Sequence, residues 1–189
     1  MKKVLLLLLF GIASFNGYTQ YEYTASQGNP YGLVNPKAPK ALKDYQPIIG
    51  ICDCTSRTRN QDRSWAAPVQ MRWEFKYIMN GMAVQDQTLK ADGKHSGSIR
   101  QYDSKAEKWY VHYYSSQSAS PKLKVWEGGM KVGEMVLYSE QKAPNGMEGF
   151  YKITFSNMSE KGFDWLGEWV NTDESIKYPT WKINCKKRE

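Results

Sequence analysis

The stretch WEFKYIMNGMAVQDQT, residues 73–88, decides the fold class. Large apolar residues at Trp73, Phe75 and Tyr77 alternate with charged ones, and a second alternating run follows Asn80-Gly81. Alternation with a period of two indicates a β-strand with one buried face. Asn-Gly favours a tight hairpin, because both central residues of a type I′ turn adopt positive φ. The stretch therefore predicts two antiparallel strands whose aromatic side chains share one face.

The same pattern continues through the rest of the chain. About ten alternating runs, divided by turn residues, follow one another from Ile48, and no convincing amphipathic helix interrupts them. The runs cover residues 48–57, 69–79, 82–91, 96–103, 109–117, 122–132 and 134–141, then segments around 151–155 and 163–169, and finally 178–186. A closed up-and-down antiparallel barrel buries the apolar face and leaves no edge strand. A two-sheet sandwich is the alternative, but its crossing connections need longer loops than most of these.

Residues 1–19 have the pattern of a secretory signal peptide. Lys2 and Lys3 precede an apolar stretch, residues 4–15, that is short for a membrane span, and small residues place a cleavage site near Thr19. An uncleaved N-terminal anchor is the alternative. We predict export to the periplasm or the extracellular space, with no transmembrane segment in the mature chain.

The next residues lead into the barrel domain. Residues 20–37 are rich in Gly, Asn, Pro and Ser and predict an extended segment. Residues 38–46 predict a short helix that Pro47 ends. The barrel domain is therefore expected to span residues 38–189.

The charge distribution argues against nucleic-acid binding. The chain has a net charge of +7, and removing residues 1–19 takes away two Lys and leaves +5. The basic residues are scattered singly along the alternating runs, and only Lys186, Lys187 and Arg188 cluster. A nucleic-acid interface needs a concentrated basic face.

Three cysteines, Cys52, Cys54 and Cys185, are the disulfide candidates. Cys52 and Cys54 share one face of a strand, and Cys185 lies in the last run. In a closed barrel the first and last strands are neighbours, so Cys185 could pair with either. An exported chain meets an oxidising environment that permits a disulfide.

Four segments resemble an uncharacterised bacterial family of secreted calycin or lipocalin-like barrels. They are WEFKYIMNGMAVQD (73–86), SIRQYDSKAEKWYVHYY (98–114), VWEGGMKVGEMVL (125–137) and ITFSNMSEKGFDWLGEW (153–169). The resemblance covers residues 40–188 and implies an up-and-down barrel with a small helical plug at the bottom. It implies no particular activity. The chain departs from the family pattern at Cys52-Asp53-Cys54.

The inward face of the barrel supplies the candidate binding residues. In residues 83–86, either Ala83 and Gln85 or Val84 and Asp86 point inward, and the same ambiguity holds around Arg100. An inward Arg100 with Gln85 or Asp86 could bind a carboxylate, or could form a structural pair. The candidates are Trp73, Phe75, Tyr77, Gln85, Asp86, Arg100, Tyr102, Trp109, Tyr113, Tyr151, Phe155 and Trp165.

No motif for metal, cofactor or nucleophilic chemistry is visible. His112 could ligate a haem, but Trp109, Val111 and Tyr113 form the expected inward face, which turns His112 outward. His95 lies in a loop, and two scattered His do not converge on a metal. We predict no catalytic residues, no metal and no cofactor.

Three functions remain open. The main hypothesis is an exported barrel that binds a small, partly apolar molecule in its lumen. The first alternative is an isomerase, cyclase or lyase that uses Arg100 and carboxylates among Asp53, Asp86, Glu127 and Glu168. The second is a structural or partner-binding envelope protein that uses exposed aromatics such as Tyr110 and Tyr114. The oligomeric state stays open.

Overall fold

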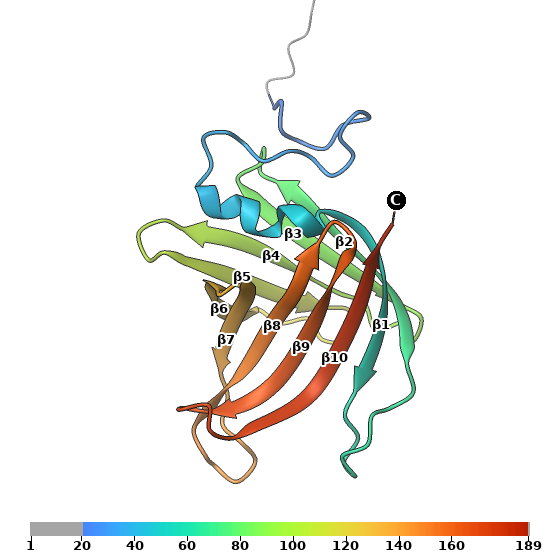
Figure 1. Cartoon of the computed structure of the whole chain (residues 1–189), viewed down its shortest axis with the longest axis vertical. Coiled ribbons are helices and arrows are strands. Elements are labelled where there is room, and N and C mark those ends of the chain that lie inside the picture. The colour runs from blue at the N-terminus through green and yellow to red at the C-terminus, as the bar shows by residue number, and fades with distance from the viewer. Residues whose placement is uncertain (1–20, 189) are drawn as a thin grey trace, which may run out of the picture.

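The computed structural model describes residues 21–188 and shows a closed antiparallel barrel (Figure 1). Each strand pairs with its neighbour in sequence, and β1 pairs with β10 to close the wall. The all-β up-and-down prediction is confirmed, whereas the predicted signal peptide lies outside the described residues. The strands are β1 (Gly50–Thr58), β2 (Val69–Ile78), β3 (Ala83–Lys90), β4 (Ser96–Asp103), β5 (Lys108–Ser115), β6 (Lys124–Lys131), β7 (Glu134–Glu140), β8 (Gly149–Ser159), β9 (Gly162–Asn171) and β10 (Lys177–Lys187).

The alternation read from the sequence sets which side chains enter the barrel. β2 buries Met71, Trp73, Phe75 and Tyr77, while Arg72 and Glu74 between them reach solvent and pair with each other. An indole or phenyl ring left in water would forfeit its transfer free energy, about 2 kcal/mol for each large apolar side chain. Closure of the wall is therefore the arrangement that keeps one complete face dry.

A disulfide crosses the seam where the barrel closes. Cys54 and Cys185 lie directly opposite each other in the β1–β10 pairing, with Cα atoms 4.1 Å apart, and form the bond. Cys52 stays free and buried. The bond links residues 131 apart in the sequence, so it removes much chain entropy from the unfolded state. It is also consistent with an oxidising, exported location.

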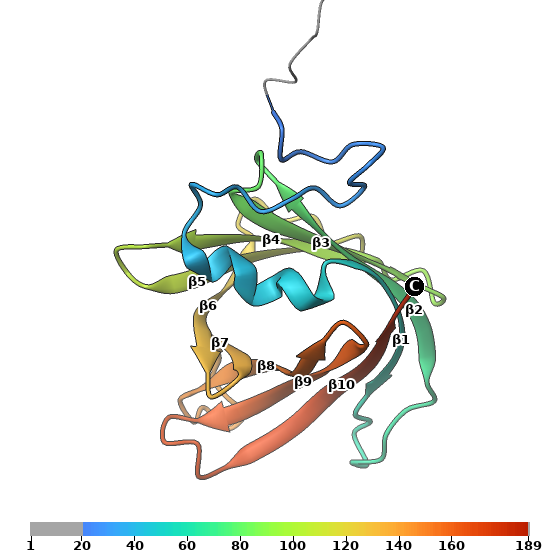
Figure 2. The same ribbon diagram turned by 45° about the horizontal axis from the view of Figure 1, so that its top comes forward.

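One end of the barrel is covered by the 3₁₀ helix η1 (Lys40–Ile48), which we call the plug (Figure 2). Three of its own side chains, Leu42, Tyr45 and Ile48, are fully buried against the barrel. The predicted helix, residues 38–46, was expected to end before Pro47. Instead the helix includes Pro47, because a proline near the end of a short 3₁₀ segment removes only one backbone hydrogen bond.

The β2–β3 connection is longer than the predicted two-residue turn. Ile78 and Ala83 are the last paired residues, so four residues form the loop, although Asn80 and Gly81 both have positive φ as expected. The irregular N-terminal segment covers this loop: the Asn35 N–H donates to the Gly81 carbonyl oxygen at 3.2 Å. A Cβ on Gly81 would lie 2.4 Å from the Leu33 carbonyl oxygen, which explains the glycine.

Within residues 21–188, no helix is long and apolar enough to cross a membrane. In the same part of the chain, no group of three or more His, Cys, Asp or Glu side chains is arranged to hold a metal ion.

Candidate functional site

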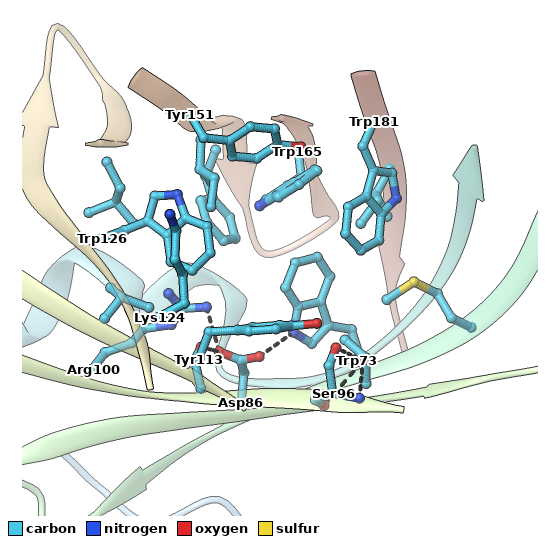
Figure 3. Close-up of a pocket in the computed structure, with 18 of the residues that line it drawn as sticks. Trp73, Asp86, Ser96, Arg100, Tyr113, Lys124, Trp126, Tyr151, Trp165 and Trp181 are labelled. Atoms are coloured by element: carbon cyan, nitrogen blue, oxygen red, sulfur yellow. Dashed lines mark hydrogen bonds and ion pairs between the residues drawn. The ribbon is translucent and has the colours of Figure 1, made fainter. Parts of the chain in front are cut away.

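The lumen contains a cavity of about 310 Å³ on the side away from the plug (Figure 3). Seven aromatic side chains from six strands line it: Trp73, Tyr113, Trp126, Tyr151, Phe155, Trp165 and Trp181. Met71, Val111, Leu137, Ile153 and Ile183 complete the apolar surface, and the polar lining residues are Asp86, Thr88, Lys90, Ser96, Ser98, Arg100, Lys124 and Gln141. Small-molecule sites in proteins occupy roughly 300–1,000 Å³ and combine such apolar walls with a few polar groups.

The plug fills the other half of the lumen. The Tyr45 ring packs edge-on against Trp109 with centroids 4.9 Å apart, and it also contacts Phe75 and Phe155. The Tyr77 hydroxyl donates to the Leu42 carbonyl oxygen at 3.1 Å. Burial raises the pKa of the Tyr45 phenol to about 12, although the nearby Arg100 charge opposes the shift. Side chains of the plug are therefore packed tightly into this end of the barrel.

The floor between the plug and the cavity is a buried polar network around Asp86. Its Oδ1 accepts hydrogen bonds from Arg100 Nη2 at 2.5 Å and from the Ser98 hydroxyl, and its Oδ2 accepts one from Trp73 Nε1 at 2.9 Å. Asp86 and Arg100 are each 3 % exposed. Three donors occupy the carboxylate, so Asp86 has a structural role in this conformation and is poorly placed to accept a proton from a substrate.

Arg100 is held between this network and three aromatic rings. Its guanidinium carbon lies 5.0 Å from the Tyr45 ring centroid and 5.4 Å from those of Phe75 and Phe155. Cation–π contacts of this kind stabilise a charge that has left water. The Arg100 Nε–H is buried without an acceptor among the described residues. The sequence left two roles open for Arg100, binding a ligand carboxylate or forming a structural ion pair. Because Asp86 already balances the Arg100 charge, the structure favours the structural ion pair.

Two lysines lie on the cavity wall farther from the plug. The Lys90 Nζ sits 5.4 Å from the Trp181 ring centroid and 3.4 Å from Asp92 Oδ2. The Lys124 Nζ sits 5.7 Å from the Trp126 ring centroid and makes one long hydrogen bond, 3.4 Å, to the Glu140 carbonyl oxygen. Figure 3 shows Lys124 beside Trp126 and Tyr113, with Trp181 on the far side of the cavity.

The predicted lumen residues fall into three groups. Trp73, Asp86, Arg100, Tyr113, Tyr151, Phe155 and Trp165 line the cavity. Phe75, Tyr77 and Trp109 also point inward but pack against the plug, and Tyr102 packs edge-on against Trp109 at 5.5 Å. Gln85 lies on the outer face, where its side-chain amide donates to the Tyr114 hydroxyl at 3.1 Å.

Gln85 does not line the lumen, because the side chains of β3 alternate between its two faces. Val84, Asp86 and Thr88 are buried on the inner face, which places Gln85 on the outer face. Sequence analysis missed several lining residues, among them Lys90, Lys124, Trp126 and Trp181. Alternation along their runs places Trp126 and Lys124 on one face, and this signal was available in the sequence. His112, which was expected to point outward, is absent from the cavity lining.

Comparison of the chain with protein-family models and with curated proteins found no match to either. The resemblance to calycin or lipocalin-like barrels therefore stays a prediction beyond the fold itself, which is a closed ten-stranded barrel.

Proposed function

We propose that this protein binds a small, largely apolar organic molecule in the lumen cavity. The observation that supports this proposal is the cavity of about 310 Å³, which seven aromatic side chains line, in a barrel whose other end is covered by the plug. Apolar surface that stays uncovered in a folded protein costs roughly 25 cal/mol per Å². An apolar ligand that covers the cavity surface gains this free energy on binding.

The arrangement favours binding over catalysis. Asp86 is the only acid among the described residues that line the cavity, and three donors already occupy it. Tyr151, whose pKa is raised by burial, shares a hydrogen bond of 2.9 Å with Thr180. The Asp86 and Tyr151 side chains therefore already form hydrogen bonds with other residues of the barrel. The outer aromatics of the partner-binding alternative, Tyr110 and Tyr114, are half-buried and form no protruding anchor.

Binding can be tested with N-phenyl-1-naphthylamine, a neutral dye whose emission rises in apolar surroundings. The matched variants are Ile183→Trp, which fills the cavity from β10, and Lys182→Trp, which adds the same ring on the exposed face next to it. We expect saturable dye binding that Ile183→Trp abolishes and Lys182→Trp preserves. No saturable binding, or equal binding by both variants, would contradict the proposal.

A further inference from the structure

The charges on the cavity wall are not balanced. Among the described residues that line it, Lys90, Arg100 and Lys124 face a single acid, Asp86. Because Asp86 lies 2.5 Å from Arg100, that pair cancels, and Lys90 forms a salt bridge with Asp92 at 3.4 Å, so Lys124 remains as one uncompensated positive charge. The excess lies on the part of the wall that is far from the plug.

Of these two lysines, Lys124 is the less satisfied. It forms no salt bridge with any described residue, and its one hydrogen bond, to a neutral carbonyl oxygen, is long at 3.4 Å. Lys90 is better covered, since its side chain is 10 % exposed and lies near Asp92. The two ammonium groups lie within cation–π range of indole rings, Lys90 at 5.4 Å from the Trp181 ring centroid and Lys124 at 5.7 Å from that of Trp126, and the Lys124 side chain is exposed to solvent.

The neighbouring Trp126 carries an unsatisfied donor. Its indole Nε1–H is shielded from solvent and has no acceptor among the described residues. A buried donor without a partner is unfavourable. Lys124 therefore stands as the one lining cation without a carboxylate partner among the described residues, next to an indole whose N–H has no acceptor.

We infer that the ligand of this cavity is a ring-bearing organic anion, whose apolar body lies among Trp73, Phe155 and Trp165 and whose acidic group lies at Lys124, with Lys90 adding a longer-range attraction. This inference rests on the proposed binding function and adds the chemical class of the ligand. A carboxylate or sulfonate supplies Lys124 with a charged acceptor and balances its charge. The aromatic walls favour a planar body, because rings pack edge-on or offset against indole and phenol rings.

The test compares 2-naphthoate with its neutral methyl ester as competitors of N-phenyl-1-naphthylamine. We expect the acid to displace the dye at roughly tenfold lower concentration than the ester, since one charge-assisted hydrogen bond contributes about 1.5 kcal/mol. Lys124→Gln should remove most of that advantage and leave the affinity for the ester unchanged. Lys90→Gln should weaken binding of the acid by a smaller factor.

Lys43→Gln is the matched control, because it makes the same change in net charge on an exposed residue of the plug, at the opposite end of the barrel. It should leave both affinities unchanged. Equal potency of acid and ester, or an equal loss in Lys43→Gln and Lys124→Gln, would overturn the inference while dye binding still supports the cavity. Absence of dye binding would instead remove the proposed function itself.

Discussion

Asp86 Oδ1 lies 2.5 Å from Arg100 Nη2, and both side chains are buried on adjacent strands of the wall. Asp86→Asn keeps the shape of the side chain but leaves the Arg100 charge without a counterion. Breaking one side of a buried ion pair costs about 3–5 kcal/mol. We expect a loss of this size in the free energy of unfolding, measured by urea denaturation.

The matched control for that variant is Glu127→Gln, because Glu127 pairs with Lys108 on the surface, where both side chains are about half exposed. Exposed pairs contribute at most about 1 kcal/mol. Equal destabilisation by Asp86→Asn and Glu127→Gln would show that the Asp86–Arg100 pair does not hold the wall as described.

Removal of the seam disulfide should destabilise the barrel strongly. The double variant Cys54→Ser, Cys185→Ser frees the unfolded chain from a loop of 131 residues, and the chain-entropy relation gives a loss of about 5 kcal/mol. Thermal unfolding of the variant and of the wild type should differ accordingly. Peptide mapping without reduction should recover Cys54 linked to Cys185, and a Cys52–Cys185 peptide would contradict the structure.

The free thiol of Cys52 should be inert in the folded protein. Burial raises its pKa to about 11, although the nearby Lys187 charge opposes the shift. The thiolate is the reactive form, so at pH 8 almost none is present. We expect no labelling by iodoacetamide under native conditions and one label per chain in urea, measured by mass spectrometry. Rapid native labelling would mean that β1 opens readily or that the thiol is exposed.

A buried carboxylate on the outer wall should set part of the pH dependence of stability. Burial raises the pKa of Glu168, while Lys152 and Lys177 oppose the shift and Glu174 adds to it. The folded state therefore binds this proton more tightly than the unfolded state, so the charged form destabilises the fold at neutral pH. Glu168→Gln should raise the melting temperature at pH 7, and the gain should fade as the pH falls below the ordinary value of 4.5.

Glu174 provides the opposite case for comparison. Burial acts to raise its pKa, but hydrogen bonds from Lys152 and Tyr138, with the charges of Lys152 and Lys177, lower the pKa overall. Its carboxylate stabilises the fold at neutral pH and loses this contribution in acid. Glu174→Gln should therefore lower the melting temperature at pH 7. Equal shifts of the same sign in both variants would contradict these assignments.

The alternation along β2 was enough to predict a closed barrel, because closure buries the face that carries Trp73, Phe75 and Tyr77. The next strand was ambiguous: polar and apolar residues occur on both of its faces, so Gln85 and Asp86 were equally plausible inside. What resolves the choice is Arg100 on the adjacent strand, a cross-strand contact that no local pattern reveals.

Two other features also depend on distant parts of the chain. Tyr45 enters the barrel end and occupies the space beside Phe75 and Trp109, so these predicted lumen residues became part of a solid core. The register of β1 against β10 selects Cys54 over Cys52 as the partner of Cys185. Spacing within one strand could not decide this, because both cysteines share one face.

The most direct test of the central claim is a crystal structure of the protein with 6-bromo-2-naphthoate, in which anomalous scattering locates the bromine. Our account predicts one bromine peak inside the barrel among Trp73, Phe155 and Trp165, with the carboxylate toward Lys124. Bromine found only on the outer wall, or a lumen that side chains fill completely, would contradict it.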